Sequence, residues 1–237
     1  MVKRINKGRK IVILGANIDK ELLLIELDAI RGDYELWSMN NVYTKYQDPK
    51  IRFSRWFELH KFERKNNRYI RRNSDRYQGT KVSAYMKEID GLCCPVYMQK
   101  KWRIIKNSTL FPFEKIIARY GKYFGCSFAW MTALALMEHG KGKRVSEIIY
   151  IGVALSGHEY YFQRPSTEYM IGIAKAKGIN ITIGAGSNLL QERYIYAYRE
   201  DPAEILTIHG EFMKLAMTNF ASSFSGALAI LWDKEVE

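Results

Sequence analysis

The chain has 237 residues, of which 47% are hydrophobic and 26% are charged, a composition typical of a globular protein with a substantial core. No apolar run reaches the roughly 18 to 20 residues that a membrane-spanning helix needs, and the apolar run at 11–14 is too short for a signal peptide. We therefore expect no membrane partner and a cytoplasmic location. Lysine and arginine number 37 against 25 acidic residues, which leaves a net charge of +12.

Strands and helices alternate from the start of the chain. Residues 9–14 predict a short buried strand, 18–30 an amphipathic helix that ends before Gly32, and 34–39 a second strand. These elements form a βαβ unit, whose strands are expected to be parallel. The turn at 15–18 lies where phosphate groups often meet helix N–H groups, although it lacks the G-x-G-x-x-G pattern.

The same alternation continues along the chain. Further helices are predicted at 84–89, 113–120, 127–137 and 168–177. Further strands are predicted at 92–97, 148–152 and 179–183, with 52–59 extended and 69–81 a loop. This order predicts an α/β fold with a Rossmann-like open, mainly parallel sheet flanked by helices. We expect one domain with a basic aromatic insertion at 50–82 and a helical tail at 201–237, whose apolar residues would pack in the core or in a homo-oligomer.

Cysteine and histidine do not form a metal motif. Cys93 and Cys94 are adjacent and Cys126 is distant, which gives neither a disulfide framework nor a Cys-x-x-Cys site. The four histidines are scattered, so no metal site is predicted from spacing. A divalent ion held by aspartates through a substrate phosphate stays open.

A basic segment carries much of the net charge. Between residues 50 and 76, ten basic residues and three acidic ones give a local net charge of +7, and five aromatic residues are interleaved with them, followed by Tyr77. Such a pattern suits a nucleic acid, whose phosphates attract the cations and whose bases stack on the rings. The candidate contacts are Arg52, Arg55, Arg64, Lys65, Arg68, Arg71 and Arg72. A solvated surface anchored by its rings, another polyanion or an acidic protein partner are the alternatives.

Four segments follow one another in an informative order. Residues 37–43 read Trp-Ser-Met-Asn-Asn-Val-Tyr. Residues 126–136 begin with Cys-Ser-Phe and continue as an apolar stretch. Residues 147–154 read Glu-Ile-Ile-Tyr-Ile-Gly-Val-Ala, and 181–190 end in Ser-Asn-Leu-Leu. In this order they resemble motifs of bacterial lipooligosaccharide sialyltransferases, of the related Maf-type flagellin glycosyltransferases and of Rossmann-like proteins encoded by phages. The resemblance covers about half of the chain.

The resemblance implies a nucleotide sugar as donor substrate. The positions that line a cytidine nucleotide in the family correspond to Asn40, Ser127 and Gly152. The predicted strand ends and turns add further candidates, namely Gly15, Asn17, Asn41 and Ser156. Arg164 is added because a guanidinium matches phosphate oxygens in a fork. The alternative is that these are turn residues that any such sheet would use.

The family's catalytic histidine has no counterpart at 163–168, where this chain reads Gln-Arg-Pro-Ser-Thr-Glu. Inverting glycosyl transfer needs a base that removes the proton of the acceptor hydroxyl. His158, Glu159 and Glu168 are the candidate bases because they follow the strand at 148–152. For His158, a hydrogen-bonded or surface role is the alternative.

These patterns predict a nucleotide-sugar-dependent glycosyltransferase whose acceptor is nucleic acid, such as modified bases of phage DNA. Two other functions remain open. The chain could bind nucleotide and nucleic acid without catalysis, or serve as a structural or assembly protein of a phage.

Overall fold

The computed structural model describes residues 8–65, 68–71, 80–156 and 162–191. The chain forms two compact units, Met1–Leu190 and Gln191–Glu237. All described elements belong to the first unit, and the helical tail predicted at 201–237 lies outside the described residues. Within the described ranges, no helix has the length and apolar character that crossing a membrane requires.

A seven-stranded sheet forms the centre of the first unit, and every neighbouring pair of its strands is parallel. The strands, in spatial order, are β7 (Ser108–Leu110), β6 (Val96–Met98), β3 (Arg55–Glu58), β2 (Tyr34–Met39), β1 (Arg9–Leu14), β8 (Val145–Ile151) and β9 (Asn180–Ile183). The predicted open parallel α/β sheet is therefore confirmed.

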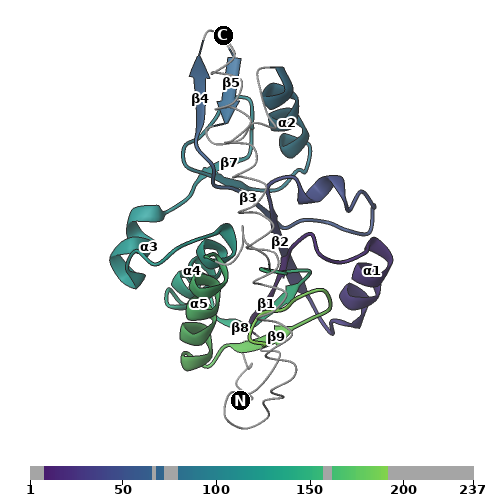
Figure 1. The fold of residues 1–237 in the computed structure, drawn as a ribbon, viewed down its shortest axis with the longest axis vertical. Coiled ribbons are helices and arrows are strands. Elements are labelled where there is room, and N and C mark those ends of the chain that lie inside the picture. Colours follow the sequence, from purple (N-terminus) through teal and green to yellow (C-terminus); the bar gives the residue numbers. More distant parts are fainter. Residues whose placement is uncertain (1–7, 66–67, 72–79, 157–161, 192–237) are drawn as a thin grey trace, which may run out of the picture. The chain divides into compact units, whose positions relative to one another are not determined.

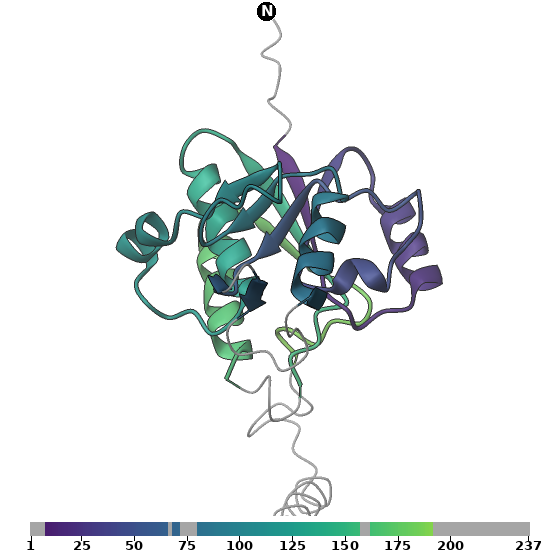
Figure 2. The same cartoon turned by 90° about the horizontal axis from the view of Figure 1, so that it is seen from above.

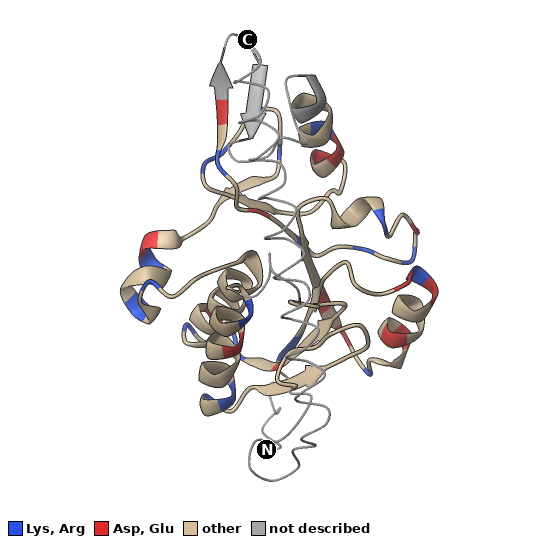
Figure 3. Cartoon of the chain, in the orientation of Figure 1, with Lys and Arg blue, Asp and Glu red and all other residues tan. Residues whose placement is uncertain are grey.

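Helices cover both faces of this sheet (Figures 1 and 2). The helices are α1 (Lys20–Ala29), α2 (Thr80–Asp90), α3 (Phe113–Tyr120), α4 (Ser127–His139) and α5 (Arg164–Ala176), with a short 3-10 helix, η1 (Val42–Thr44). Figure 1 shows α1 and α2 on one side of the sheet and α3, α4 and α5 on the other. Figure 3 shows charges of both signs along α1 and α3, as expected for helices with a solvent-exposed face.

The core consists of two layers because side chains alternate across each strand. Ile11 and Ile13 of β1 belong to the cluster that includes α4. Val12 and Leu14 of the same strand belong to the cluster that includes α1 and α2. All four side chains are fully buried, which is typical of a strand in a parallel sheet covered by helices on both faces.

Three segments differ from the prediction. The strand predicted at 92–97 starts later, as β6, because Cys93 has a left-handed backbone (φ 54°) and Pro95 follows. β7 was not predicted. The segment 50–82 is not wholly an insertion, because β3 lies in the sheet with Trp56 and Phe57 fully buried. The chain then leaves the sheet to form a separate antiparallel pair, β4 (Phe62–Lys65) and β5 (Arg68–Arg71).

Candidate functional site

The strand order creates a topological switch point between β1 and β8. From β1 the chain continues through α1 to β2 on one side, and from β8 through α5 to β9 on the other. Connections that diverge in this way leave a crevice at the carboxyl ends of the two strands. Leu14 pairs with Ile151, so Gly15 and Gly152 follow neighbouring strand ends.

The turns at this switch point pack against one another through their backbones. A Cβ on Gly15 would overlap the carbonyl oxygen of Gly152 and lie 2.8 Å from its carbonyl carbon. A Cβ on Gly186, in the turn after β9, would overlap the carbonyl oxygen of Asn17. The Asn17 side-chain amide also donates to the Gly186 carbonyl at 2.9 Å. Glycine is therefore required here for close approach of the chain.

Backbone groups of the turn after β1 already have partners in the protein. The amides of Gly15 and Asn17 donate to Ile151 and Gly152 at 2.8 and 2.9 Å. The hydroxyl of the buried Tyr46 lies within hydrogen-bond distance of the Gly15 and Ile18 carbonyls, at 3.1 and 3.0 Å. Burial raises the pKa of Tyr46 to about 12. A phosphate would therefore meet the exposed start of α1 rather than the Gly15 and Asn17 amides.

Asn40 and Asn41 stand directly after β2. Asn40 has a positive φ of 54°, and its amide donates to the Phe57 carbonyl at 3.1 Å. Its side-chain Oδ1 is buried and has no hydrogen-bond partner among the described residues. A buried amide oxygen without a donor is costly, so it is suited to accept a hydrogen bond from a ligand. The Asn41 carbonyl accepts the Thr44 hydroxyl at 2.8 Å.

Ser127 is the first residue of α4, and its side chain is half-buried. The turn that precedes it is fixed to α5, since the Gly125 amide donates to Ser166 Oγ at 2.9 Å. The starts of α4 and α5 therefore lie side by side at the carboxyl edge of the sheet. Ser156, which follows β8, is exposed.

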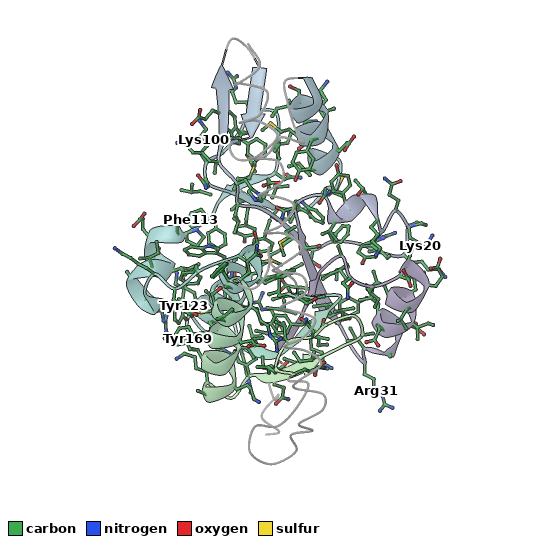
Figure 4. All side chains as sticks on the ribbon, viewed as in Figure 1. Lys20, Arg31, Lys100, Phe113, Tyr123 and Tyr169 are labelled. Carbon is green, nitrogen blue, oxygen red and sulfur yellow. The ribbon has the colours of Figure 1, made fainter. Side chains whose placement is uncertain are left out.

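An exposed aromatic pair lies beside this turn. Tyr123 and Tyr169 meet edge to face with ring centroids 5.6 Å apart, and each is about half exposed. Figure 4 shows them next to each other between α3 and α5. Exposed rings of this kind can stack on a base or on the apolar face of a sugar.

Arg164 and Glu168 form an ion pair within α5. Arg164 Nε donates to Glu168 Oε1 at 2.8 Å. The same Oε1 accepts the Leu190 amide at 2.7 Å. Glu168 therefore joins the start of α5 to the segment after β9, and its role as a base stays a prediction. His158 and Glu159 lie outside the described residues.

A second polar cluster, not predicted from the sequence, lies at the end of β3. Glu58 is completely buried, and its Oε1 lies 2.6 Å from Nδ1 of His60. The backbone amide of His60 donates to the same oxygen at 3.2 Å, and the Tyr85 hydroxyl donates to Oε2. The His60 side chain is 40% exposed. A buried carboxylate thus holds an imidazole that is open to solvent.

Tyr85 is itself held in place by packing. It lies in α2, and its ring is nearly parallel to that of Phe62, with centroids 6.4 Å apart. The ring of Tyr43 in η1 also packs against Tyr85, with the two ring centroids 6.2 Å apart. The orientation of Glu58 is therefore determined by four separate elements, β3, α2, β4 and η1.

Arg55 belongs to an ion network rather than to a nucleic-acid surface. Its Nε lies 3.0 Å from Glu35 and its Nη1 2.7 Å from Glu138. Arg9 contacts the same two carboxylates at 2.5 and 2.7 Å. The Arg55 guanidinium also lies over the Trp37 ring, 4.5 Å from its centroid. We correct the predicted role of Arg55, because its charge is compensated inside the domain at the amino edge of the sheet.

The other cations of the basic segment have different positions. Arg52 is exposed and has no ion pair with any described residue, and it lines a surface groove together with Phe53 and Asp48. In the hairpin of β4 and β5, the register places Arg64 opposite Tyr69 and Lys65 opposite Arg68. Arg71 ends this hairpin, and Arg72 lies outside the described residues.

Three rings of the basic segment are part of the core. Trp56 and Phe57 are fully buried, and Phe62 is nearly so. These three are therefore not available for stacking on bases, in agreement with the alternative that the rings anchor the segment. Across the described parts of the chain, no three His, Cys, Asp or Glu side chains are grouped so that they could hold a metal ion.

Comparisons with protein-family models, with curated proteins and with solved structures found no match for this chain. The resemblance to sialyltransferases and Maf-type glycosyltransferases therefore stays a prediction.

Proposed function

We propose that the protein binds a nucleotide sugar at the carboxyl edge of its sheet and transfers the sugar to an acceptor hydroxyl. The observation that carries this proposal is the strand order, whose switch point lies between β1 and β8. Asn40, Ser127 and Gly152 come from three separate parts of the chain, and each follows a strand or begins a helix at this edge. Ligand sites of open α/β sheets are found in this place.

The unpartnered Oδ1 of Asn40 supports a polar ligand at the end of β2. Nucleotides supply suitable donors, since ribose hydroxyls and exocyclic amines carry N–H or O–H groups. The exposed Tyr123 and Tyr169 rings would add a stacking surface at the start of α4.

Nucleic acid is the acceptor that we propose, because the hairpin of β4 and β5 leaves the sheet directly after β3. Its register sets two cations, Lys65 and Arg68, opposite each other. Lysine and arginine are the residue types that neutralise the phosphates of a nucleic acid.

A second candidate function is nucleotide and nucleic-acid binding without catalysis. One observation favours it, namely that the candidate base Glu168 forms an ion pair with Arg164. In this case the same ligands would bind, but no sugar would be transferred.

A thermal-shift screen against nucleotides and nucleotide sugars tests binding, because a ligand of the native state raises the melting temperature. We expect Asn40→Gly to abolish the shift, since glycine keeps the positive φ and removes the amide. The matched control is Asn180→Ala, at the exposed start of β9 on the opposite edge of the sheet. A shift that is equal in both variants would remove Asn40 from the site.

Mass spectrometry of DNA incubated with the protein and the donor identified in this way tests transfer. Added mass on hydroxymethylated bases supports the transferase. Binding without added mass supports the second function, and the absence of any nucleotide-dependent shift contradicts both.

A further inference from the structure

The cluster at the end of β3 has the arrangement of an oriented proton acceptor. Among the described contacts of Glu58, the backbone amide of His60 and the Tyr85 hydroxyl donate to its carboxylate, and Nδ1 of His60 lies 2.6 Å from Oε1. When Glu58 is ionised, its carboxylate can only accept hydrogen bonds, and Nδ1 of His60 then carries the proton. The lone pair of the ring is then on Nε2, the nitrogen that can receive a proton from a bound substrate.

Burial and exposure are divided between the two side chains. The Glu58 side chain is 0% exposed, and the His60 side chain is 40% exposed. The carboxylate therefore acts on the imidazole in a medium that screens charge poorly, while the imidazole remains within reach of a ligand. Tyr85, which packs against Phe62 and Tyr43, prevents the carboxylate from turning away.

The cluster also lies beside the proposed donor site. Met39 pairs with Phe57, so Asn40 and Glu58 occupy neighbouring positions on β2 and β3. The Asn40 amide donates to the Phe57 carbonyl, which fixes these two strand ends to each other. A ligand that reaches Oδ1 of Asn40 therefore lies at the end of β2, next to the end of β3, which His60 follows.

We propose that His60 is the general base of the transfer reaction and that Glu58 is its positioning residue, an inference that rests on the proposed function. Nε2 of His60 takes the proton of the acceptor hydroxyl while the hydroxyl oxygen forms a bond to the anomeric carbon. The bond between that carbon and the donor phosphate oxygen breaks, and its electron pair leaves with the nucleotide. The proton stays on the imidazolium, whose charge is balanced by Glu58.

The first experiment measures the orientation of His60 without any substrate. Diethyl pyrocarbonate acylates the unprotonated nitrogen of an imidazole, and peptide mass spectrometry of the full chain follows each histidine separately. On the alkaline plateau of the rate–pH profile, where protonation of the ring no longer limits the reaction, we expect His60 to react several-fold more slowly in Glu58→Gln than in the wild type. His139 is the internal reference, because it lies at the end of α4 and its ring nitrogen is near the Val145 amide at 3.2 Å. Equal His60 rates in the two proteins overturn the assignment.

Glu58→Asp is the second variant, in case Glu58→Gln does not fold. It keeps the negative charge and withdraws the oxygens from Nδ1, so the same slowing is expected, and an unchanged His60 rate again overturns the assignment. Circular dichroism of each variant checks that the fold is retained.

The second experiment measures transfer. We expect His60→Gln to lower kcat by about 10²- to 10⁴-fold with donor binding unchanged, while His139→Gln alters neither. Unchanged kcat in His60→Gln overturns the assignment. A wild-type protein that neither binds nor consumes any nucleotide sugar overturns the proposed function instead. The acylation rates then decide separately whether Glu58 orients the His60 ring.

Discussion

Alanine at Gly186 would test how tightly the turns after β1, β8 and β9 are packed. Gly186 has a φ of +70°, and a Cβ there would overlap the Asn17 carbonyl oxygen and lie 2.9 Å from its carbonyl carbon. A left-handed backbone costs a non-glycine residue about 1–2 kcal/mol, and overpacking costs about 1–3 kcal/mol more. We therefore expect Gly186→Ala to lower the free energy of unfolding by about 2–5 kcal/mol.

Two other glycines separate these contributions. Gly32 has a φ of +84° with no atom within 4 Å of its added Cβ, so Gly32→Ala is expected to cost only the conformational part, about 1–2 kcal/mol. Gly172 lies inside α5, also with open space around the added Cβ. There alanine is expected to stabilise the protein by about 0.5–1 kcal/mol, because it favours the helix.

Urea unfolding followed by tryptophan fluorescence measures all three variants. The fully buried Trp37 and Trp56 report on the unit that contains these glycines. The melting temperature should fall by about 2–4 °C for each kcal/mol lost. If Gly186→Ala costs no more than Gly32→Ala, the backbones of the two turns are not in close contact and our reasoning on this junction is wrong.

Three further predictions concern charge and thiol chemistry. Burial alone would raise the pKa of Glu138, but hydrogen bonds from two arginines outweigh it and hold this pKa below its ordinary value of 4.5. Glu138→Gln should therefore lower the free energy of unfolding by about 1.5–3 kcal/mol at neutral pH. This difference from the wild type should vanish as the pH falls through the lowered pKa of Glu138. Unfolding curves recorded at a series of acidic pH values measure it. Burial raises the pKa of the Cys94 thiol to about 12, whereas Cys93 is exposed. Iodoacetamide at pH 8 should therefore label Cys93 first. Faster labelling of Cys94 would contradict its burial. If the basic segment binds nucleic acid, Arg52→Ala should reduce the salt dependence of binding by about 0.9 in the log–log slope, whereas Arg31→Ala, at the far end of α1 (Figure 4), should leave it unchanged.

Much of the fold follows from hydrophobic periodicity. The strands at 9–14 and 34–39 and the helix at 113–120 were predicted with the bounds that the structure has. β7 escaped prediction because its three residues are Ser-Thr-Leu with Leu110 exposed, which gives no apolar pattern. The hairpin of β4 and β5 escaped because its polar sequence resembles a loop, and its pairing depends on contacts outside the segment.

The candidate site was only partly predictable. Gly15 was placed correctly after β1, whereas Gly152, predicted as the last residue of its strand, is the first residue after β8. The cluster around His60 was missed because Tyr85 is distant in the sequence from Glu58. One signal was present: Glu58 interrupts the apolar run Trp-Phe-Glu-Leu, where a carboxylate is expected only if it has buried partners, and His60 follows two residues later.

The ion network of Arg9, Glu35, Arg55 and Glu138 has a consequence at the opposite edge of the sheet. It connects the first residues of β1, β2 and β3 to the last turn of α4. A slip of one strand by a single residue would move its charged group by about 3.3 Å and break its ion pairs. The network therefore fixes how far each strand extends, and thereby the positions of Gly15, Asn40 and Glu58 at the carboxyl ends of the strands.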